Sequence, residues 1–187
     1  MYGIMPDAES VTAATKIDHD QWRNETMIQT PWMSEANLSL GGRWSLFSGS
    51  GHLWLLRTNP KWGFIQFYTH LSVARDLVGL KEVRCDMAPD PLAFRVIKSD
   101  ASVRGYGSHG YYQASTTYSN DVVVALPKDL VETILANAGR EFTIAFDTSE
   151  PGWEEMQVPT YVLRGFVDRL EQEGMWSSEA AVASSDS

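Results

Sequence analysis

A short apolar run, Val122 to Leu126, followed directly by a segment with helical periodicity, constrains the fold of this chain more than any other feature. Three consecutive β-branched valines favour a strand that is buried on both faces. Pro127 cannot donate a hydrogen bond to a sheet, and it suits the first turn of a helix. The sequence therefore predicts a strand that leads into a helix, with the other strands packed against this unit.

The residues that follow extend the unit towards the C-terminus. Apolar residues recur at the spacing of one helical face within 128–138, and the segment 142–146 alternates in the manner of a strand with one buried face. Pro151 and Gly152 indicate a turn. A last strand is expected to begin at Tyr161 and Leu163, and a closing helix with an apolar side follows it. All of these positions fit a hydrophobic core, and no polar groups converge among them.

Segments rich in aromatic residues, separated by glycine, asparagine and proline turns, predict antiparallel strands earlier in the chain. Strands are expected at 43–48, 52–58, 61–70, 82–86, 92–97 and 111–118, with a glycine-rich turn at 104–110. Residues 71–80 fit either a short helix or a loop. Because several strands are apolar on both faces, the expected fold is α+β and β-rich. It would have an antiparallel, sandwich-like core, one or two packed helices and extended termini.

The length of 187 residues predicts one domain with appendages. We expect an N-terminal arm, 1–37, a core domain, 38–170, and a flexible acidic tail, 171–187. The charges follow this division: the arm has six acids and two bases, and the tail has four acids and no base. The middle is nearly neutral and has no basic stripe that could neutralise phosphates, so no nucleic-acid partner is expected.

A single cysteine, Cys85, excludes a framework of intramolecular disulfides. No apolar run approaches about 18 residues, so no transmembrane segment is expected. The first ten residues lack the basic and apolar regions of an intact signal peptide. A cytoplasmic location is therefore favoured, and a periplasmic one applies if an export signal was removed.

Sequence motifs for catalysis are weak. The glycines of 105–110 match a dinucleotide-binding pattern, but a strand-like segment follows where that site needs a helix. Residue 106 is not the glycine that a nucleophile elbow at Ser108 requires. A triad of Ser108 with His52 or His70 and Asp100 is one arbitrary choice among many serines. A hydrolase centred on His109 is therefore kept as an alternative, and the leading expectation is that the protein is not an enzyme.

Metal and cofactor sites have no support in the sequence. The four histidines lie far apart, without a pair at metal-ligand spacing. Glu154 and Glu155 are adjacent, so on a strand their side chains point to opposite faces. Cys85 has no histidine near it in sequence and is expected to be a buried structural thiol. No cofactor is predicted.

The richness in aromatic residues is the feature that most indicates binding. Flat aromatic surfaces with polar neighbours bind protein partners or sugars. For the tryptophans of the arm two interpretations stay open: they fold back on the core, or they dock on a partner. The candidate binding residues are Trp22, Trp32, Trp62, Tyr106, His109, Tyr111 and Tyr112.

The order of several motifs resembles small exported bacterial proteins of the invasion-associated locus B type. The motifs are RWSLF, V-R-C-D, V-V-A-L-P, L-V-x-x-I-L, FTIAF and V-P-T-Y-V-L-R-G-F, and they span about two-thirds of the chain. The resemblance implies a β-sandwich-like domain with a helix and carries over no active site. This chain has one cysteine where such proteins usually carry a pair.

The leading hypothesis is a non-enzymatic accessory subunit that docks onto a larger protein assembly through its arm and its aromatic surface. Three alternatives stay open. The first is a carbohydrate-binding or envelope-associated module that uses Trp62, Tyr106, Tyr111 and Tyr112. The second is an inhibitor of another macromolecular machine, and the third is the hydrolase centred on His109. A protein partner is thus expected, and a glycan is the alternative ligand.

Overall fold

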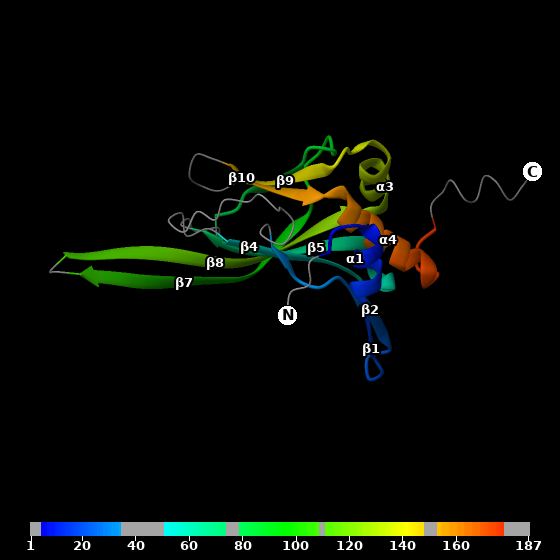
Figure 1. Ribbon diagram of the computed structural model, residues 1–187, viewed down its shortest axis with the longest axis horizontal. Coiled ribbons are helices and arrows are strands. Elements are labelled where there is room, and N and C mark those ends of the chain that lie inside the picture. Colours follow the sequence, from blue (N-terminus) through cyan, green and yellow to red (C-terminus); the bar gives the residue numbers. More distant parts are fainter. Residues whose placement is uncertain (1–4, 35–50, 74–78, 109–110, 148–152, 178–187) are drawn as a thin grey trace, which may run out of the picture.

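The computed structural model describes residues 5–34, 51–73, 79–108, 111–147 and 153–177. In this part of the chain, a seven-stranded and a three-stranded antiparallel sheet form a sandwich-like core with packed helices. The smaller sheet lies over one face of the larger sheet, and the helices gather at one end (Figure 1). The prediction of a β-rich α+β fold is confirmed.

The larger sheet has the strand order β1-β2-β4-β5-β8-β7, and β3 also pairs with β4. Its strands are β1 (Lys16–Asp20), β2 (Glu25–Gln29), β3 (Met33–Ser34), β4 (Gly51–Thr58), β5 (Phe64–Val73), β7 (Phe94–Ser108) and β8 (Tyr111–Pro127). The smaller sheet has the order β10-β9-β6, formed by β6 (Glu82–Cys85), β9 (Glu141–Asp147) and β10 (Trp153–Pro159). The helices are α1 (Ala8–Ala14), α3 (Lys128–Asn137) and α4 (Thr160–Gln172), and η1 (Pro60–Trp62) is a single 3₁₀ turn.

The predicted strand–helix unit is present. The valines of β8 lie inside the larger sheet, paired with β5 on one side and with the edge strand β7 on the other. Pro127 ends β8 and takes the N-cap position of α3, with an extended backbone. Helix α3 then buries Leu130, Val131 and Ile134, as its periodicity predicts. The apolar run and the proline together therefore determine where the sheet stops and the helix starts.

Alternation in β5 separates the two faces of the larger sheet. Ile65, Phe67 and Leu71 are fully buried and belong to one continuous core with residues of the smaller sheet and the helices. The intervening residues, Gln66, Tyr68 and His70, point to the opposite face and are partly exposed. We call this second surface the outer face.

Two element boundaries differ from the predictions. The last strand is β10, and the residues expected to begin it, Tyr161 and Leu163, lie in α4. Pro159 separates the two elements, and the buried residues of α4 recur at helical spacing from Val162 onwards. The glycine-rich segment 104–108 continues β7, so the turn is shorter than expected. The strand predicted at 43–48 lies outside the described residues.

The segment expected as an arm packs along most of its described length. Helix α1 lies against α4, and Met5, Val11, Ile28 and Met33 are buried in the common core. At the other end, the chain beyond α4 brings Met175 and Trp176 against the core. The core of the domain therefore includes residues from the N-terminal segment.

Two hairpins extend away from this core. One is formed by β1 and β2, and the other is the long ribbon of β7 and β8 (Figure 1). No helix in the described part of the chain is long and apolar enough to span a bilayer.

Candidate functional site

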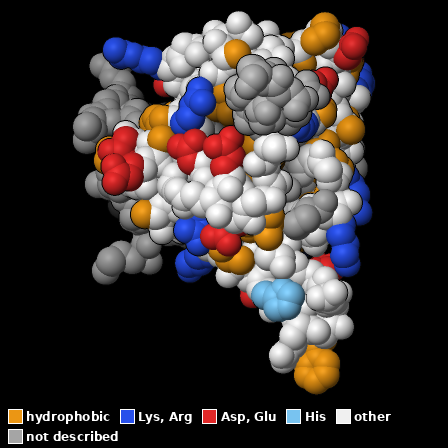
Figure 2. Space-filling model, turned by 90° about the vertical axis from the view of Figure 1, so that its right-hand side faces the viewer, with side chains coloured by type: hydrophobic (Ala, Val, Ile, Leu, Met, Phe, Trp, Pro, Cys, Tyr) orange, Lys and Arg blue, Asp and Glu red, His pale blue; other side chains and the backbone are white. Residues whose placement is uncertain are grey.

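The β1–β2 hairpin is attached to the rest of the larger sheet at its base. Strand β2 pairs with β4 only through Ile28 and Gln29, which lie opposite Thr58 and Arg57. Every residue of β1 is exposed. Figure 2 shows the hairpin projecting below the body of the molecule, with a hydrophobic side chain at its end. The free end is therefore open to contact from several sides.

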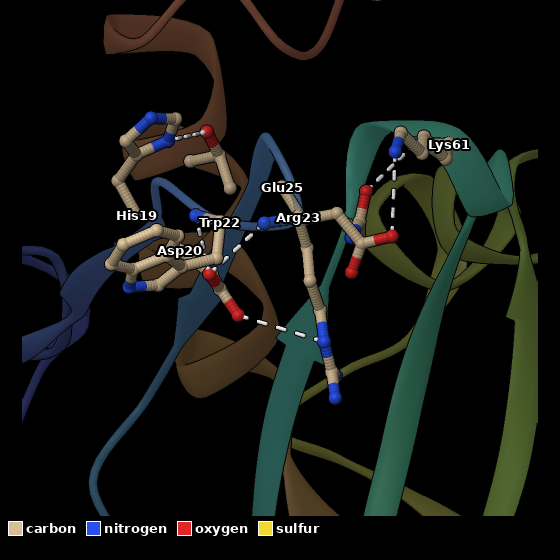
Figure 3. Close-up of polar contacts among 8 residues, drawn as sticks. His19, Asp20, Trp22, Arg23, Glu25 and Lys61 are labelled. Atoms are coloured by element: carbon tan, nitrogen blue, oxygen red, sulfur yellow. Dashed lines mark hydrogen bonds and ion pairs between the residues drawn. The ribbon is translucent and has the colours of Figure 1, made fainter.

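Trp22 lies in the turn of this hairpin and is 90% exposed. The carboxylate of Asp20 holds the turn, because its Oδ1 accepts hydrogen bonds from the backbone N–H of Trp22 at 2.9 Å and of Arg23 at 3.1 Å. Asn24 follows with a φ of 49°, a left-handed conformation that asparagine tolerates. Figure 3 shows these contacts together with the indole ring, to which no dashed line is drawn. The backbone of the tip is thus ordered while its largest apolar group faces solvent.

Polar pairs connect the two strands of the hairpin with each other and with η1. Nδ1 of His19 lies 3.1 Å from the hydroxyl of Thr26 across the ladder. The Nζ of Lys61, in η1, lies 3.3 Å from a carboxylate oxygen of Glu25 (Figure 3). Each exposed pair contributes little stability, at most about 1 kcal/mol. The Lys61–Glu25 pair links the hairpin to η1, whereas the His19–Thr26 contact lies within the hairpin.

A second cluster lies on the outer face, around Tyr68. Its ring meets Trp32 edge to face at a centroid distance of 5.4 Å, and the guanidinium of Arg57 lies 4.8 Å from its centroid. The centroid of Trp62 lies 5.9 Å from the same guanidinium, and its ring stacks on Phe64. These ring contacts stabilise the cluster and occupy much of its aromatic surface.

Asp121 is the acidic centre of the neighbouring part of the outer face. Its Oδ1 lies 2.6 Å from Nδ1 of His70. Burial raises the pKa of Tyr68, and the charge of Asp121 and a hydrogen bond to it raise that pKa further. Lys98, in the register position opposite Asp121, forms an ion pair of 2.5 Å with Asp100. The acids of this region are therefore already engaged with cations or hydrogen-bond donors.

The structure does not bring the predicted binding residues together. Trp22 is at the hairpin tip, whereas Trp32 and Trp62 belong to the cluster on the outer face. Tyr106, Tyr111 and Tyr112 lie by register at the far end of the β7–β8 ribbon. Their side chains and the whole of His109 lie outside the described residues. The seven residues thus occupy three separate places.

The triad considered from sequence does not assemble around His70. The carboxylate beside His70 is Asp121, and Asp100 pairs with Lys98 instead. Ser108 is eight residues beyond Asp100 on the same strand, which places their backbones about 26 Å apart. Among the described residues, no group of three or more histidine, cysteine or acidic side chains is arranged to hold a metal ion.

Cys85 is buried in β6, and burial raises the pKa of its thiol to about 11. The thiol is therefore protonated at neutral pH and is a poor nucleophile. This places Cys85 in the core, where it acts as a small apolar side chain.

Sequence reasoning missed Arg57, Tyr68 and Asp121, and it considered His70 only in a triad with Ser108 and Asp100. A signal for three of them is present, because arginine, tyrosine and histidine interrupt strands that are otherwise apolar, at alternate positions of one face. The partner of His70 is far away in the sequence. This partner is identified only by the pairing of β5 with β8, which places His70 opposite Asp121.

Comparison of the chain with family models, curated proteins and solved structures gives no match. The functional argument therefore rests on the geometry of the hairpin tip and of the outer face.

Proposed function

We propose that this protein is a non-enzymatic interaction subunit that docks onto a protein partner through the tip of the β1–β2 hairpin. The observation that carries the proposal is the indole of Trp22, 90% exposed at the end of a projecting hairpin. An exposed tryptophan in an ordered turn contributes nothing to the core of its own domain. It has the size and polarity of the residues that dominate protein interfaces.

The chemistry of the tip defines the partner surface. An indole needs an apolar pocket, and its N–H needs one acceptor at the edge of that pocket. The flanking residues, Asp20, Arg23, Glu25 and Lys61, are paired charges of both signs, which suits a polar rim around such a pocket. A protein partner with an apolar pocket and a mixed-charge rim is therefore the expected ligand.

Two alternatives for the function relate to this surface in different ways. The sugar platform predicted from Trp62, Tyr106, Tyr111 and Tyr112 lacks support as one site, because Trp62 stacks on Phe64 far along the sheet from the ribbon end. An inhibitor would use the same hairpin tip and would differ only in its effect on the partner's activity. The resemblance to exported proteins of the invasion-associated locus B type remains a prediction.

The test compares two exposed tryptophans. Full-length protein is used to isolate a complex of fixed stoichiometry from the source organism, and the partner is then purified and titrated. Trp22→Ala should weaken binding by about 30-fold or more, the loss expected for an interface hot spot. Trp153→Ala removes a tryptophan that is 44% exposed on the smaller sheet and should leave the affinity unchanged. Equal affinity of the wild type and Trp22→Ala for the partner would refute the proposal.

A further inference from the structure

Arg57 occupies an unusual environment for a cation on a sheet surface. Its side chain is half-buried, and its guanidinium lies near the rings of both Tyr68 and Trp62. Its Nε donates a hydrogen bond of 2.8 Å to Oε1 of Gln66, the residue opposite it in β5. These contacts hold the guanidinium in position and orientation, and the hydrogen bond to Gln66 uses its Nε rather than its two terminal nitrogens.

No carboxylate in the described part of the chain pairs with Arg57. Burial lowers the pKa of this arginine, and the nearby positive charge of Arg95 lowers it further. The two acids of the neighbouring region are engaged elsewhere, Asp121 with His70 and Asp100 with Lys98. A partly desolvated cation without an anionic partner is unfavourable. The local charge balance therefore favours an added anion at Arg57.

The position of Arg57 connects it to the hairpin. Arg57 lies opposite Gln29, the last residue of β2, so it is at the base of the hairpin whose tip carries Trp22. Arg57 lies on a sheet face beside Gln66 and Tyr68 of the neighbouring strand, whereas small-molecule sites are usually concave. A fixed arginine among aromatic rings is typical of a protein interface.

We propose that Arg57 is the receptor for an aspartate or glutamate side chain of a protein that docks on the outer face. The terminal nitrogens of a guanidinium match the two oxygens of a carboxylate in a bidentate pair, and Arg95 adds attraction for the same negative charge. Trp32 and Trp62 would contact the residues on either side of the acid. This inference rests on the proposed function and adds the chemistry of a second contact to it.

The test uses a blocked pentapeptide, acetyl-Ala-Leu-Glu-Leu-Ala-amide, titrated into the ¹⁵N-labelled full-length protein. The glutamate peptide should shift the Arg57 Nε–H and Trp62 indole resonances, and the otherwise identical glutamine peptide should bind at least tenfold more weakly. Arg57→Gln and Arg57→Lys should each weaken binding of the glutamate peptide at least tenfold, because the first loses the charge and the second loses the planar fork. Arg84→Gln is the matched control, since Arg84 is exposed on the smaller sheet and paired with Glu82.

Each other outcome overturns the inference. Equal binding of the two peptides would remove the role of the carboxylate, and unchanged binding in both Arg57 variants would place the site elsewhere. Acetate binding as tightly as the glutamate peptide would identify a free anion rather than a protein ligand. Trp22→Ala is expected to leave the response to the peptide intact, so a failed peptide titration would refute only the Arg57 contact. Failure of the proposed function would instead appear in the partner titration, as equal affinity of the wild type and Trp22→Ala.

Discussion

Gly165 of α4 lies so close to α1 that a Cβ at this position would come within 2.3 Å of the carbonyl oxygen of Ala8 and 2.8 Å of the Cβ of Val11. The hydroxyl of Thr12 also donates a hydrogen bond of 2.8 Å to the carbonyl oxygen of Gly165. Helix α1 therefore meets α4 backbone to backbone. This contact joins the N-terminal segment to the C-terminal helix.

Gly165→Ala should destabilise the protein by about 1–3 kcal/mol, because the new methyl group displaces backbone atoms of α1. Chemical denaturation followed by far-UV circular dichroism measures the change. Gly139→Ala is the control, since no atom lies within 4 Å of a Cβ there, and it should change the stability by less than about 0.5 kcal/mol. Equal effects of the two substitutions would contradict the close packing of α1 on α4.

Ile28 and Ile17 lie opposite each other in the β1–β2 ladder, but Ile28 is fully buried and Ile17 is 38% exposed. Ile28→Ala should cost about 2–5 kcal/mol of unfolding free energy, because it opens a cavity in the core. Ile17→Ala should cost less than about 1 kcal/mol, since its methyl groups are partly in water already. A stability of Ile28→Ala within 1 kcal/mol of the wild type would show that the N-terminal segment does not share the core.

These two positions also show what could be predicted from the sequence. The strand and helix around Pro127 followed from a valine run and a helical period, both of which are local patterns. The burial of Ile28 depends on pairing with Thr58, thirty residues away, and no local periodicity of apolar residues indicates it. For the same reason, the sequence left two interpretations open for the tryptophans of the first 37 residues: packing on the core or docking on a partner. The structure places Trp32 in the outer-face cluster and Trp22 in solvent.

The strand boundary before α4 was wrong for a related reason. Val162 is β-branched and Leu163 is bulky and apolar, and both come shortly after a proline and a threonine. This local pattern resembles the start of a strand. Their burial with Phe166, Val167 and Leu170 on one face of a helix becomes evident only over three turns. Of the site, the exposed indole of Trp22 was anticipated as one of two interpretations. The ring contacts of Arg57 required the register of β4 on β5.

The thiol of Cys85 should react slowly. With a pKa raised to about 11, its thiolate fraction at pH 8 is about 100-fold below that of an exposed thiol with an ordinary pKa of about 9, and burial slows access further. Alkylation by iodoacetamide at pH 8 should therefore be at least about 100-fold slower in the folded protein than in urea. The rate should keep rising with pH up to about 11 while the fold persists. Equal rates in folded and unfolded protein would contradict the burial of β6.

The raised pKa of Tyr68 should make stability fall in alkali. Between the unfolded pKa, about 10, and the higher folded pKa, the folded state binds more protons, so the free energy of unfolding decreases as pH rises through this range. Tyr68→Phe should reduce that slope. It should not abolish it, because Tyr161 and Cys85 also have raised pKa values. Denaturation at pH 9, 10 and 11 measures the slope, and an identical slope in the variant would contradict the raised pKa of Tyr68.

The emission of Trp22 should report its environment directly. The fluorescence lost on Trp22→Phe should be red-shifted and readily quenched by acrylamide, because the indole is in water. The same substitution should leave the stability within about 0.5 kcal/mol of the wild type. A blue-shifted difference spectrum would show that the tip is folded back on the protein.

The central claim is that the hairpin tip touches a protein partner, and photocrosslinking in the source organism tests it most directly. A photoreactive phenylalanine analogue is placed at position 22 in one strain and at position 153 in another, and adducts are identified after irradiation. The account predicts one dominant protein adduct from position 22 that is missing from position 153. No adduct at position 22, or the same set of adducts from both positions, would contradict it.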